Sequence, residues 1–262
     1  MDEPVEKLDS RFRLDGRKAL VTGASSGLGR HLALTLGKAG AEVVVAARRA
    51  DKLATLVDEM AQHGARAHAV SLDVSDGASV RAGFDRIADV AGTVDVVVNN
   101  AGVTATKPAL QQSEEDWDLV LNTNLKGAWL VAQEGARRLI GAKVPGSIIN
   151  IASILGERVA GGVGPYAISK AGLIQSTKVL ALELARHAIR VNAILPGYIV
   201  TDLNREFLES EAGERLRARI PTRRFGRVEH LDGPLLLLAS EAGAHMTGAV
   251  LAVDGGHLVS SL

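Results

Sequence analysis

The segment RKALVTGASSGLGRHLALTLGKAG, residues 17–40, decides the fold class of this chain. An apolar run over 17–23 ends in a glycine turn, and Leu32, Leu36 and Ala39 then recur at helical spacing. A buried strand followed by a glycine-rich turn and an amphipathic helix is the opening unit of doubly wound α/β domains. We therefore expect the first strand of a parallel sheet at 17–23.

The alternation of strand and helix patterns continues along the chain. One helical pattern at 50–64 ends at glycine, and another at 113–140 opens with Ser113 and Asp116 at capping-box spacing. Six further apolar runs predict strands at 42–48, 65–74, 94–102, 146–153, 189–197 and 248–256. Because these runs are apolar throughout, we predict an α/β fold with a doubly wound, seven-stranded parallel sheet and helices on both faces.

The 262 residues show no linker, internal repeat or low-complexity segment, so we predict a single domain over 1–262. Residues 1–15 are expected to form a surface extension. Residues 199–227 form one long polar interruption. Their mixture of basic and acidic residues predicts a solvated helical lid that covers the substrate site.

Composition narrows the classes of function. Thirty basic and thirty acidic residues cancel, so no overall field favours nucleic acid or anionic lipid as a partner. The chain has no cysteine, which excludes disulfides and thiolate chemistry. Its seven histidines show no metal-ligand spacing, so we predict no metal site and place them on the surface or behind the site. The acidic start MDEPVEKLDS and the lack of long apolar runs predict a soluble, cytoplasmic protein without membrane contact.

The turn TGASSGLG, residues 22–29, is the candidate phosphate-binding element. Its glycines let the backbone turn sharply and approach a pyrophosphate, while the free N–H groups of the next helix bind the anion. The alternative is a tight connection without a ligand. The cofactor contacts predicted here are Gly23, Ser25, Ser26, Gly27, Leu28 and Gly29.

The end of the second predicted strand favours NADP over NAD. A fold that binds NAD places an acid about 20 residues past the glycines, where it holds the ribose 2′-hydroxyl. Arg48 and Arg49 occupy that point here, and a guanidinium suits the 2′-phosphate of NADP; the alternative is a solvated basic turn. Asp73 is placed to accept a hydrogen bond from an adenine amino group, and NNAG at 99–102 would let the cofactor lie close to the backbone. These segments add Asp73, Val74, Asn100, Ala101 and Gly102 to the predicted cofactor site.

Tyr166 and Lys170, in GPYAISKAG at 164–172, stand one helical turn apart. Pro165 favours a helix start here, so the positive end of the helix and Lys170 should together lower the pKa of the Tyr166 phenol. The spacing alone is also compatible with chance. Ser153 strengthens the pair, because a hydroxyl at the end of a strand can bond a substrate carbonyl and stabilise oxyanion charge.

Asn124, inside NTNLKG at 122–127, is a polar residue in an apolar helical pattern. Its amide is expected to be either satisfied by backbone groups or part of a proton path.

Together these motifs resemble the short-chain dehydrogenase/reductase family. The match in order and spacing includes TGASSGLG, NNAG, NTNLKG, Ser153 thirteen residues before Tyr166, Tyr166 four residues before Lys170, PGYIVTDL (196–203) and TGAVLAVDGG (247–256). The resemblance covers nearly the whole chain from about Gly16. It implies a Rossmann-type sheet and assembly into a homotetramer.

The resemblance also implies a role for each matching residue. Tyr166 is the proton donor and acceptor, and Lys170 holds the nicotinamide ribose and lowers the pKa of the tyrosine. Ser153 orients the substrate, and Asn124 holds a water that connects Lys170 to solvent. In this family an arginine after the second strand accompanies NADP, although Ser26 stands where some NADP-dependent members carry a further basic residue. The residues expected to border the nicotinamide are Pro196, Gly197, Ile199 and Thr201.

The leading expectation is an NADP(H)-dependent oxidoreductase acting on a carbonyl/secondary alcohol pair, with NAD as a possible cofactor. A non-catalytic dinucleotide sensor or scaffold is the alternative, although such a protein has no need of an acid–base tyrosine. Within the enzyme class, a 3-oxoacyl thioester reductase and a sugar, polyol or cyclic-ketone dehydrogenase are both open. The first should carry basic residues near the cleft, with Arg186, Arg223 and Arg224 as candidates. The second is mildly disfavoured as a sugar enzyme, because the expected pocket residues are mostly apolar: Ile154, Leu155, Val159, Val163, Tyr198 and Leu203.

Overall fold

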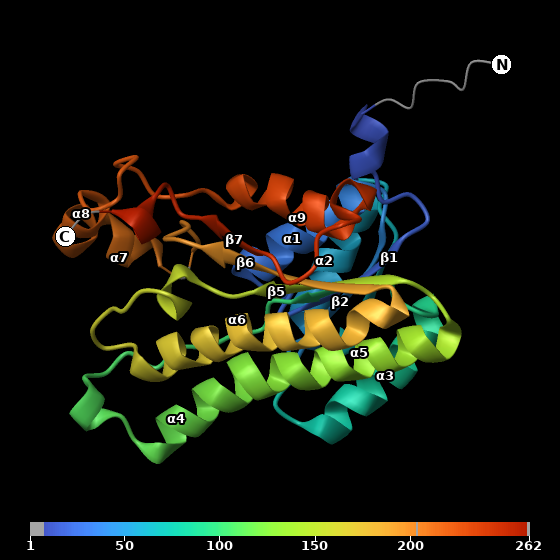
Figure 1. The fold of residues 1–262 in the computed structure, drawn as a ribbon, viewed down its shortest axis with the longest axis horizontal. Helices are drawn as coiled ribbons and strands as arrows, with labels where there is room; N and C mark the ends of the chain where they lie inside the picture. The colour runs from blue at the N-terminus through green and yellow to red at the C-terminus, as the bar shows by residue number, and fades with distance from the viewer. Residues whose placement is uncertain (1–7, 203, 261–262) are drawn as a thin grey trace.

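Seven parallel strands form the central sheet of the computed structural model, which describes residues 8–202 and 204–260. Their spatial order is β3-β2-β1-β4-β5-β6-β7, and Figure 1 labels β1, β2, β5, β6 and β7. The strands are β1 (Lys18–Thr22), β2 (Glu42–Ala47), β3 (Ala67–Ser71), β4 (Val96–Asn99), β5 (Gly146–Ile151), β6 (Ile189–Pro196) and β7 (Val250–Val253). The predicted doubly wound parallel sheet is confirmed. Each strand is shorter than its predicted run, because Gly, Asn and Asp residues turn the chain at the ends.

The chain builds β1 to β3 in one direction and then crosses over to β4 on the other side of β1. β1 pairs in parallel with both β2 and β4, with Leu20 opposite Val44 on one side and Val97 on the other. In open α/β sheets a ligand binds at such a crossover, outside the carboxyl ends of the strands. The topology therefore predicts a ligand site outside the carboxyl ends of β1 and β4.

Helices cover both faces of the sheet (Figure 1). One face carries α1 (Gly27–Lys38), α2 (Ala50–Gln62) and α9 (Asp232–Ala239), and the other carries α3 (Gly77–Ala91), α5 (Ala128–Ala142) and α6 (Gly164–Leu184). Leu36, Leu56 and Leu235 belong to the hydrophobic cluster on the first face. Phe84 and Leu139 belong to the cluster on the second face. Both faces of the sheet are thus removed from water at the inner strands β1, β2, β4, β5 and β6, which accounts for their uninterrupted apolar runs.

The helical pattern at 113–140 is not one regular helix. α4 (Glu114–Leu121) begins with the predicted capping box, in which Ser113 and Asp116 each bond the other's backbone N–H. A π-helical segment, Asn122–Gly127, then separates α4 from α5. Such wide turns are rare, occur mostly at functional sites, and leave no periodicity signal that a short sequence would reveal. The prediction of a continuous helix was therefore wrong at the NTNLKG motif.

The long polar segment at 199–227 forms two short helices, α7 (Arg205–Glu209) and α8 (Glu211–Arg217). Leu208 and Ile220 are buried and anchor this segment, whereas most of its charged side chains are exposed. The predicted pocket residue Leu203 lies outside the described residues. Figure 1 shows α7 and α8 at the same end of the molecule as the start of α6.

The described part of the N-terminal extension lies partly on the surface and partly in the core. In a short 3-10 helix, Leu8–Phe12, residues 9–12 are exposed, but Leu14 is fully buried and its backbone N–H bonds the carbonyl of Ala39 at 2.9 Å. Leu14 therefore ties this segment to the end of α1.

Within residues 8–202 and 204–260, no helix is both long and apolar enough to cross a lipid bilayer. The same residues bring no three histidine, aspartate or glutamate side chains together in a way that could hold a metal ion.

Candidate active site

Ser153 and Tyr166 meet at the carboxyl end of β5. Ser153 follows β5 directly, and Tyr166 is the third residue of α6, in the first turn that contains Pro165. The Ser153 hydroxyl interacts with the phenol and accepts a hydrogen bond from the N–H of Leu155 at 3.1 Å. Tyr198, which follows β6, lies close enough to influence the same phenol. The sequence-predicted hydroxyl pair is thus brought together.

The pKa of the Tyr166 phenol differs from the expectation in its direction. Burial is the largest influence and raises the pKa above its usual value, the interaction with Ser153 lowers it in part, and Tyr198 raises it further. The prediction that Lys170 and the helix start lower this pKa was therefore wrong for the structure as it stands. Its physical reason is that removing the phenol from water disfavours the phenolate.

Lys170 is almost fully buried, with 4% of its surface exposed. Its ammonium group donates a 2.7 Å hydrogen bond to the carbonyl of Ile151 at the end of β5. It also lies 5.6 Å from the centre of the Tyr166 ring. Burial lowers the pKa of Lys170 to about 8, so a substantial fraction of this side chain is neutral at mildly alkaline pH.

Asn124 is fully buried and its amide is satisfied at both ends. Its Oδ1 accepts from the N–H of Val103 at 2.8 Å, and its Nδ2 donates to the carbonyl of Val103 at 2.9 Å. Nδ2 also donates to the Ser169 hydroxyl at 3.1 Å, and that hydroxyl donates to the carbonyl of Tyr166 at 2.7 Å. Satisfaction by backbone groups, one of the two expectations for Asn124, is found, and the proton path stays a prediction. The π-helical turn presents this amide to the loop after β4 and, through Ser169, to the first turn of α6.

Gly102 shows how closely these groups converge. A Cβ atom at this glycine would lie 3.4 Å from Oδ1 of Asn124 and 3.7 Å from Nζ of Lys170. The loop after β4, the π-helical turn and α6 therefore meet at one point beside Tyr166.

The glycine turn after β1 approaches the end of β4 as closely as backbone permits. Gly23 has a φ of 66°, and a Cβ on it would lie 2.7 Å from Cα of Ala101. A Cβ on Gly29 would lie 2.4 Å from both Nδ2 of Asn100 and the carbonyl oxygen of Gly23. Asn100 itself bonds the carbonyl of Thr22 at 3.0 Å, so its amide fastens the two strand ends together. Only glycine fits at these two positions.

The start of α1 offers free backbone donors. Ser26 is the N-cap residue, but its side chain makes no capping hydrogen bond. The first N–H groups of a helix have no partner within the helix. Those of α1 face the glycine turn, and the side chain of Ser26 does not bond them. A close-packed glycine turn and uncapped N–H groups fit a pyrophosphate.

Arg49 reaches across to that turn from the start of α2. Its Nη2 donates to the hydroxyl of Ser25 at 2.9 Å and to that of Ser26 at 3.1 Å. Its neighbour Arg48 is exposed and its positive charge helps to lower the pKa of Asp73, although the hydrogen bond from Ser75 is the larger cause. The structure thus places guanidinium groups where the ribose of a dinucleotide's adenosine half would lie, which fits a phosphate on that ribose.

Two of the predicted cofactor residues, in the turn after β3, also have structural partners. Asp73 Oδ1 accepts from the N–H of Ser75 at 3.0 Å and from its hydroxyl at 2.7 Å. Val74 is buried and packs against Gly127 of the π-helical segment.

The segment after β6 is folded by a residue that sequence reasoning missed. Asn204 Oδ1 accepts from the N–H of Thr201 at 2.8 Å and from its hydroxyl at 3.2 Å, while Nδ2 donates to the carbonyl of Ile199 at 2.9 Å. Ile199 is buried, and a Cβ on Gly197 would lie 2.8 Å from Cα of Asp254. Pro196 is the last residue of β6 and is also buried.

The predicted pocket residues differ in how far the structure exposes their side chains. Ile154 is 1% exposed and packs in a hydrophobic cluster with Leu173 and Leu195, so its prediction as a substrate contact was wrong. It supports the loop from behind. Leu155 and Val163 are half-buried beside the site, whereas Val159 is 93% exposed.

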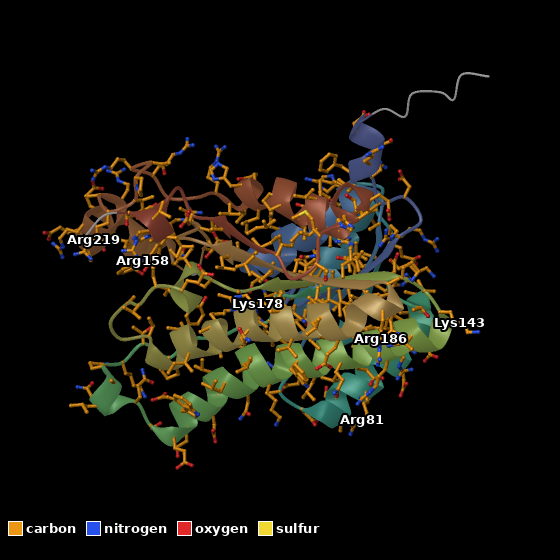
Figure 2. The ribbon with its side chains drawn as sticks, in the orientation of Figure 1. Arg81, Lys143, Arg158, Lys178, Arg186 and Arg219 are labelled. Carbon is orange, nitrogen blue, oxygen red and sulfur yellow. The ribbon has the colours of Figure 1, made fainter. Side chains whose placement is uncertain are left out.

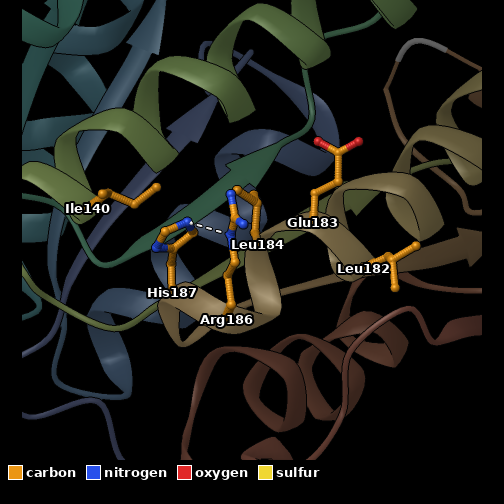
Figure 3. A pocket seen from close by; sticks show the side chains of 6 residues that line it. All are labelled: Ile140, Leu182, Glu183, Leu184, Arg186 and His187. Atoms are coloured by element: carbon orange, nitrogen blue, oxygen red, sulfur yellow. Dashed lines mark hydrogen bonds between the residues drawn. The ribbon is translucent and has the colours of Figure 1, made fainter.

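Arg186 does not lie near the site. It follows the carboxyl end of α6, and a helix of the length of α6 spans about 30 Å. Figure 2 shows Arg186 at the opposite end of the molecule from Arg158 and Arg219. Figure 3 shows the shallow pocket that Arg186 borders with Ile140 and Leu182. The expectation of Arg186 as a basic residue beside the cleft was therefore wrong, while Arg223 and Arg224 lie in the segment after α8.

His257 was expected on the surface or behind the site, and the structure buries it. It is 6% exposed, and its ring centre lies 5.7 Å from that of Tyr198. The Nη1 group of Arg158 bonds its carbonyl. The sequence carried no spacing signal for this contact, because the two residues are 99 positions apart.

Comparison with known proteins places this arrangement in a family. The sequence model of a family described as enoyl-(acyl carrier protein) reductase matches residues 23–257. The 3-oxoacyl-(acyl-carrier-protein) reductase FabG of Aquifex aeolicus is 38% identical over 248 residues, which cover 94% of this chain and 98% of the relative. The gluconate 5-dehydrogenase of Gluconobacter oxydans is 36% identical over 250 residues, which cover 95% and 97%.

A solved structure agrees. The gluconate 5-dehydrogenase of Burkholderia cenocepacia, crystallised with NADP and tartrate, superposes with a TM-score of 0.93 at 37% identity and covers 97% of this chain and 100% of its own. The matching fold, the full coverage and the ordered motifs lead to one conclusion: this chain belongs to the short-chain dehydrogenase/reductase family.

Proposed function

We propose that this chain transfers a hydride between NADP(H) and a carbonyl/secondary alcohol substrate, with Tyr166 as the proton donor and acceptor. The observation that carries the proposal is the contact of the Ser153 hydroxyl with the Tyr166 phenol at the sheet edge where the glycine turn also ends. A dinucleotide sensor would need the turn but not this pair. The family membership supports an oxidoreductase over the sensor.

NADPH, when bound, supplies the hydride that adds to the substrate carbonyl carbon. The chain's own residues manage the carbonyl oxygen. The Ser153 hydroxyl donates a hydrogen bond to that oxygen and polarises the bond. Tyr166 gives its phenolic proton to the same oxygen, so the product is an alcohol and the enzyme is left with a phenolate. Because burial raises the pKa of Tyr166, the phenol is protonated and ready to act as an acid at neutral pH.

The phenolate must then recover a proton. Lys170 lies 5.6 Å from the ring centre and has a pKa lowered to about 8, so it can lend positive charge to the phenolate and exchange protons near neutral pH. We propose that Asn124 holds the water that links Lys170 to solvent. The double hydrogen bond of its side chain to Val103 supports a positioning role for this residue.

For the cofactor we propose the residues that the sequence motifs and the family resemblance indicate, with the close-packed glycine turn in support. The glycine turn would take the pyrophosphate, Arg48 and Arg49 the 2′-phosphate, and Asp73 with Val74 the adenine. Asn100, Ala101 and Gly102 would lie against the cofactor, and Lys170 would hold the nicotinamide ribose. The nicotinamide itself would be bordered by Pro196, Gly197, Ile199 and Thr201. On the substrate side, Leu155 and Tyr198 would join Ser153 and Tyr166.

We also propose that the chain is a single domain that assembles into a homotetramer, with 199–227 as its substrate lid. Helices α4, α5 and α6 support assembly, because they expose apolar side chains that a soluble monomer rarely shows together. These are Trp117, Leu119, Ile140, Ile168, Val179 and Leu182, with Leu182 83% exposed. Light scattering on the purified protein, with Leu182→Glu as the variant, tests this. A cytoplasmic location stays a prediction that cell fractionation would check.

NADPH oxidation tests the proposed function directly. A panel of simple ketones, β-keto esters and acyl thioesters should contain at least one substrate whose addition consumes NADPH in proportion to the alcohol formed. Binding of NADPH without turnover of any member, or of their alcohols in the reverse direction, would favour the sensor instead.

A further inference from the structure

Arg158 is a half-buried cation with an incomplete set of partners. It follows the loop after Ser153, and its Nη1 donates to the carbonyl of His257 and, at 2.6 Å, to the hydroxyl of Ser260. Within the described parts of the chain, its Nε and Nη2 groups make no hydrogen bond and no carboxylate lies within ion-pair distance of it. A guanidinium withdrawn from water in this way is stabilised by an anion.

The carboxylate of Asp254, on the segment after β7, is not available to Arg158. Asp254 accepts from the N–H of Gly256 at 2.8 Å and from that of Leu258 at 2.6 Å. Both of its oxygens therefore hold the turn after β7.

His257, whose carbonyl Arg158 bonds, is a second residue with a polar atom that lacks a hydrogen-bond partner in the described part of the chain. The residue is 6% exposed, and its Nδ1 atom has no hydrogen-bond partner among the residues that the structure describes. Burial lowers the pKa of His257, and the charges of Arg158 and Arg219 lower it further. A buried ring nitrogen without a partner costs free energy unless a ligand supplies one.

This cluster is connected to the reacting phenol. The Tyr198 ring lies tilted beside that of His257, with 5.7 Å between the ring centres, and Tyr198 also influences the phenol of Tyr166. Arg158 in turn influences Tyr198. The line from Tyr166 through Tyr198 to Arg158 therefore runs along the ends of β5, β6 and β7, away from the glycine turn. Figure 2 shows Arg158 and Arg219 together at this end of the molecule.

We propose that Arg158, His257 and Tyr198 form a subsite for a carboxylate on the substrate, so that the preferred substrates are small oxo acids and their hydroxy acids. This inference rests on the proposed hydride transfer. The free Nε and Nη2 groups of Arg158 form a fork that matches the two oxygens of a carboxylate. His257 and Tyr198 supply further polar atoms beside it. The subsite discriminates between the two substrate classes left open by the sequence, because a 3-oxoacyl thioester carries no carboxylate next to its reacting carbonyl.

Matched pairs of substrates test the proposal. Oxo acids with the carbonyl two to six carbons from the carboxyl group are compared with their methyl esters in NADPH oxidation. The best oxo acid should exceed its ester in kcat/KM by about 10- to 100-fold, the range expected for charge-assisted hydrogen bonds. Arg158→Gln should reduce that ratio at least about tenfold through KM, and Arg158→Lys should restore part of it. Arg81→Gln is the control and should leave the ratio unchanged, because Arg81 is an exposed cation on α3 with no ion-pair partner among the described residues.

A binding measurement keeps the test independent of turnover. Tyr166→Phe protein is titrated with hexanoate and with hexanamide by calorimetry in the presence of NADP. The carboxylate should bind more tightly than the amide, and Arg158→Gln should remove the difference. Equal affinity of acid and amide, or an acid preference that survives Arg158→Gln, overturns the subsite. Turnover of esters without any preference for the acids overturns the subsite and leaves the proposed hydride transfer standing. Carboxylate binding that needs Arg158, without turnover of any carbonyl compound, overturns the hydride transfer and leaves the subsite standing.

Discussion

The ammonium group of Lys170 lies 5.6 Å from the centre of the Tyr166 ring, and its direct hydrogen bond goes to the carbonyl of Ile151. Lys170 therefore acts on the phenol through its charge and not through a hydrogen bond. Burial works against that charge, because it lowers the pKa of Lys170 and raises the pKa of Tyr166. Burial therefore favours the uncharged form of each group, which is the protonated phenol of Tyr166 and the neutral amine of Lys170.

This state of Tyr166 predicts opposite pH profiles for the two directions of the reaction. Carbonyl reduction needs the protonated phenol, so its kcat/KM should be flat through neutral pH and fall as the pH rises through the raised pKa of Tyr166. Alcohol oxidation needs the phenolate, so its kcat/KM should rise about tenfold per pH unit below that pKa. Steady-state kinetics from pH 6 upward in both directions measure this. A rate of oxidation that falls with rising pH would contradict it.

Lys170 predicts a dependence of stability on pH. Its folded-state pKa of about 8 lies below the ordinary value of 10.5, so between these pH values the unfolded chain holds more protons. Folding is penalised while Lys170 is charged in both states, and the penalty is relieved as the pH rises from 8 toward 10.5. The shift corresponds to an upper bound on the order of 3 kcal/mol.

Urea unfolding of the wild type and Lys170→Met at a series of pH values isolates that contribution. The unfolding free energy of the wild type should gain on that of the variant as the pH rises. A difference that stays constant, or that shrinks, would show that Lys170 is not desolvated as the structure indicates.

Arg49 predicts cofactor preference. It bonds Ser25 and Ser26 beside the glycine turn, where its charge would meet a 2′-phosphate. Arg49→Ala should weaken NADPH binding about tenfold or more and leave NADH binding nearly unchanged, since only the former carries that phosphate. Fluorescence titration with both nucleotides measures the two affinities, with Arg81→Ala as the matched loss of one exposed cation. Comparable catalytic efficiency of the wild type with NADH and NADPH would count against this account.

Gly29 predicts a steric limit on the cofactor turn. A methyl group there would collide with Asn100 and with the carbonyl of Gly23, so Gly29→Ala should lose about 1–3 kcal/mol of unfolding free energy and most NADPH affinity. Gly141→Ala is the matched control, because a Cβ on Gly141 meets nothing within 4 Å and the residue lies in α5. It should raise stability by up to about 1 kcal/mol. Urea unfolding and nucleotide titration compare the two variants, and equal behaviour would refute the close approach.

Much of the fold could be predicted because its signals are local. Each strand reads as an apolar run, the capping box of α4 lies within four residues, and the glycine turn follows β1 directly. The family and the parallel sheet were predicted and are confirmed.

The remaining features depend on contacts between distant segments. The π-helical turn at Asn124 depends on packing against Val74 and on the two hydrogen bonds between the Asn124 side chain and the backbone of Val103. Ile154 turns inward because the cluster around Leu173 receives it, and sequence gives no sign of which way it faces. The direction of the Tyr166 pKa follows from its burial in the folded chain, whereas the neighbours in sequence suggested the opposite.

His257 and Arg158 illustrate the same limit for the site. Their contact joins residues 99 positions apart, and it forms only when β5 and β7 end at the same edge of the sheet. The residues that bind a substrate are therefore less visible in the sequence than those that bind the cofactor.

The measurement that tests the central claim most directly compares the only two tyrosines of the chain. With a substrate found in the panel, Tyr166→Phe should lower kcat for NADPH oxidation by about 10²- to 10⁴-fold, the usual contribution of a general acid. Its NADPH affinity should stay within about threefold of the wild type. Tyr198→Phe, which keeps the acid in place, should lose no more than about tenfold. Turnover by Tyr166→Phe at the rate of the wild type would contradict the assignment of Tyr166 as the proton donor and acceptor.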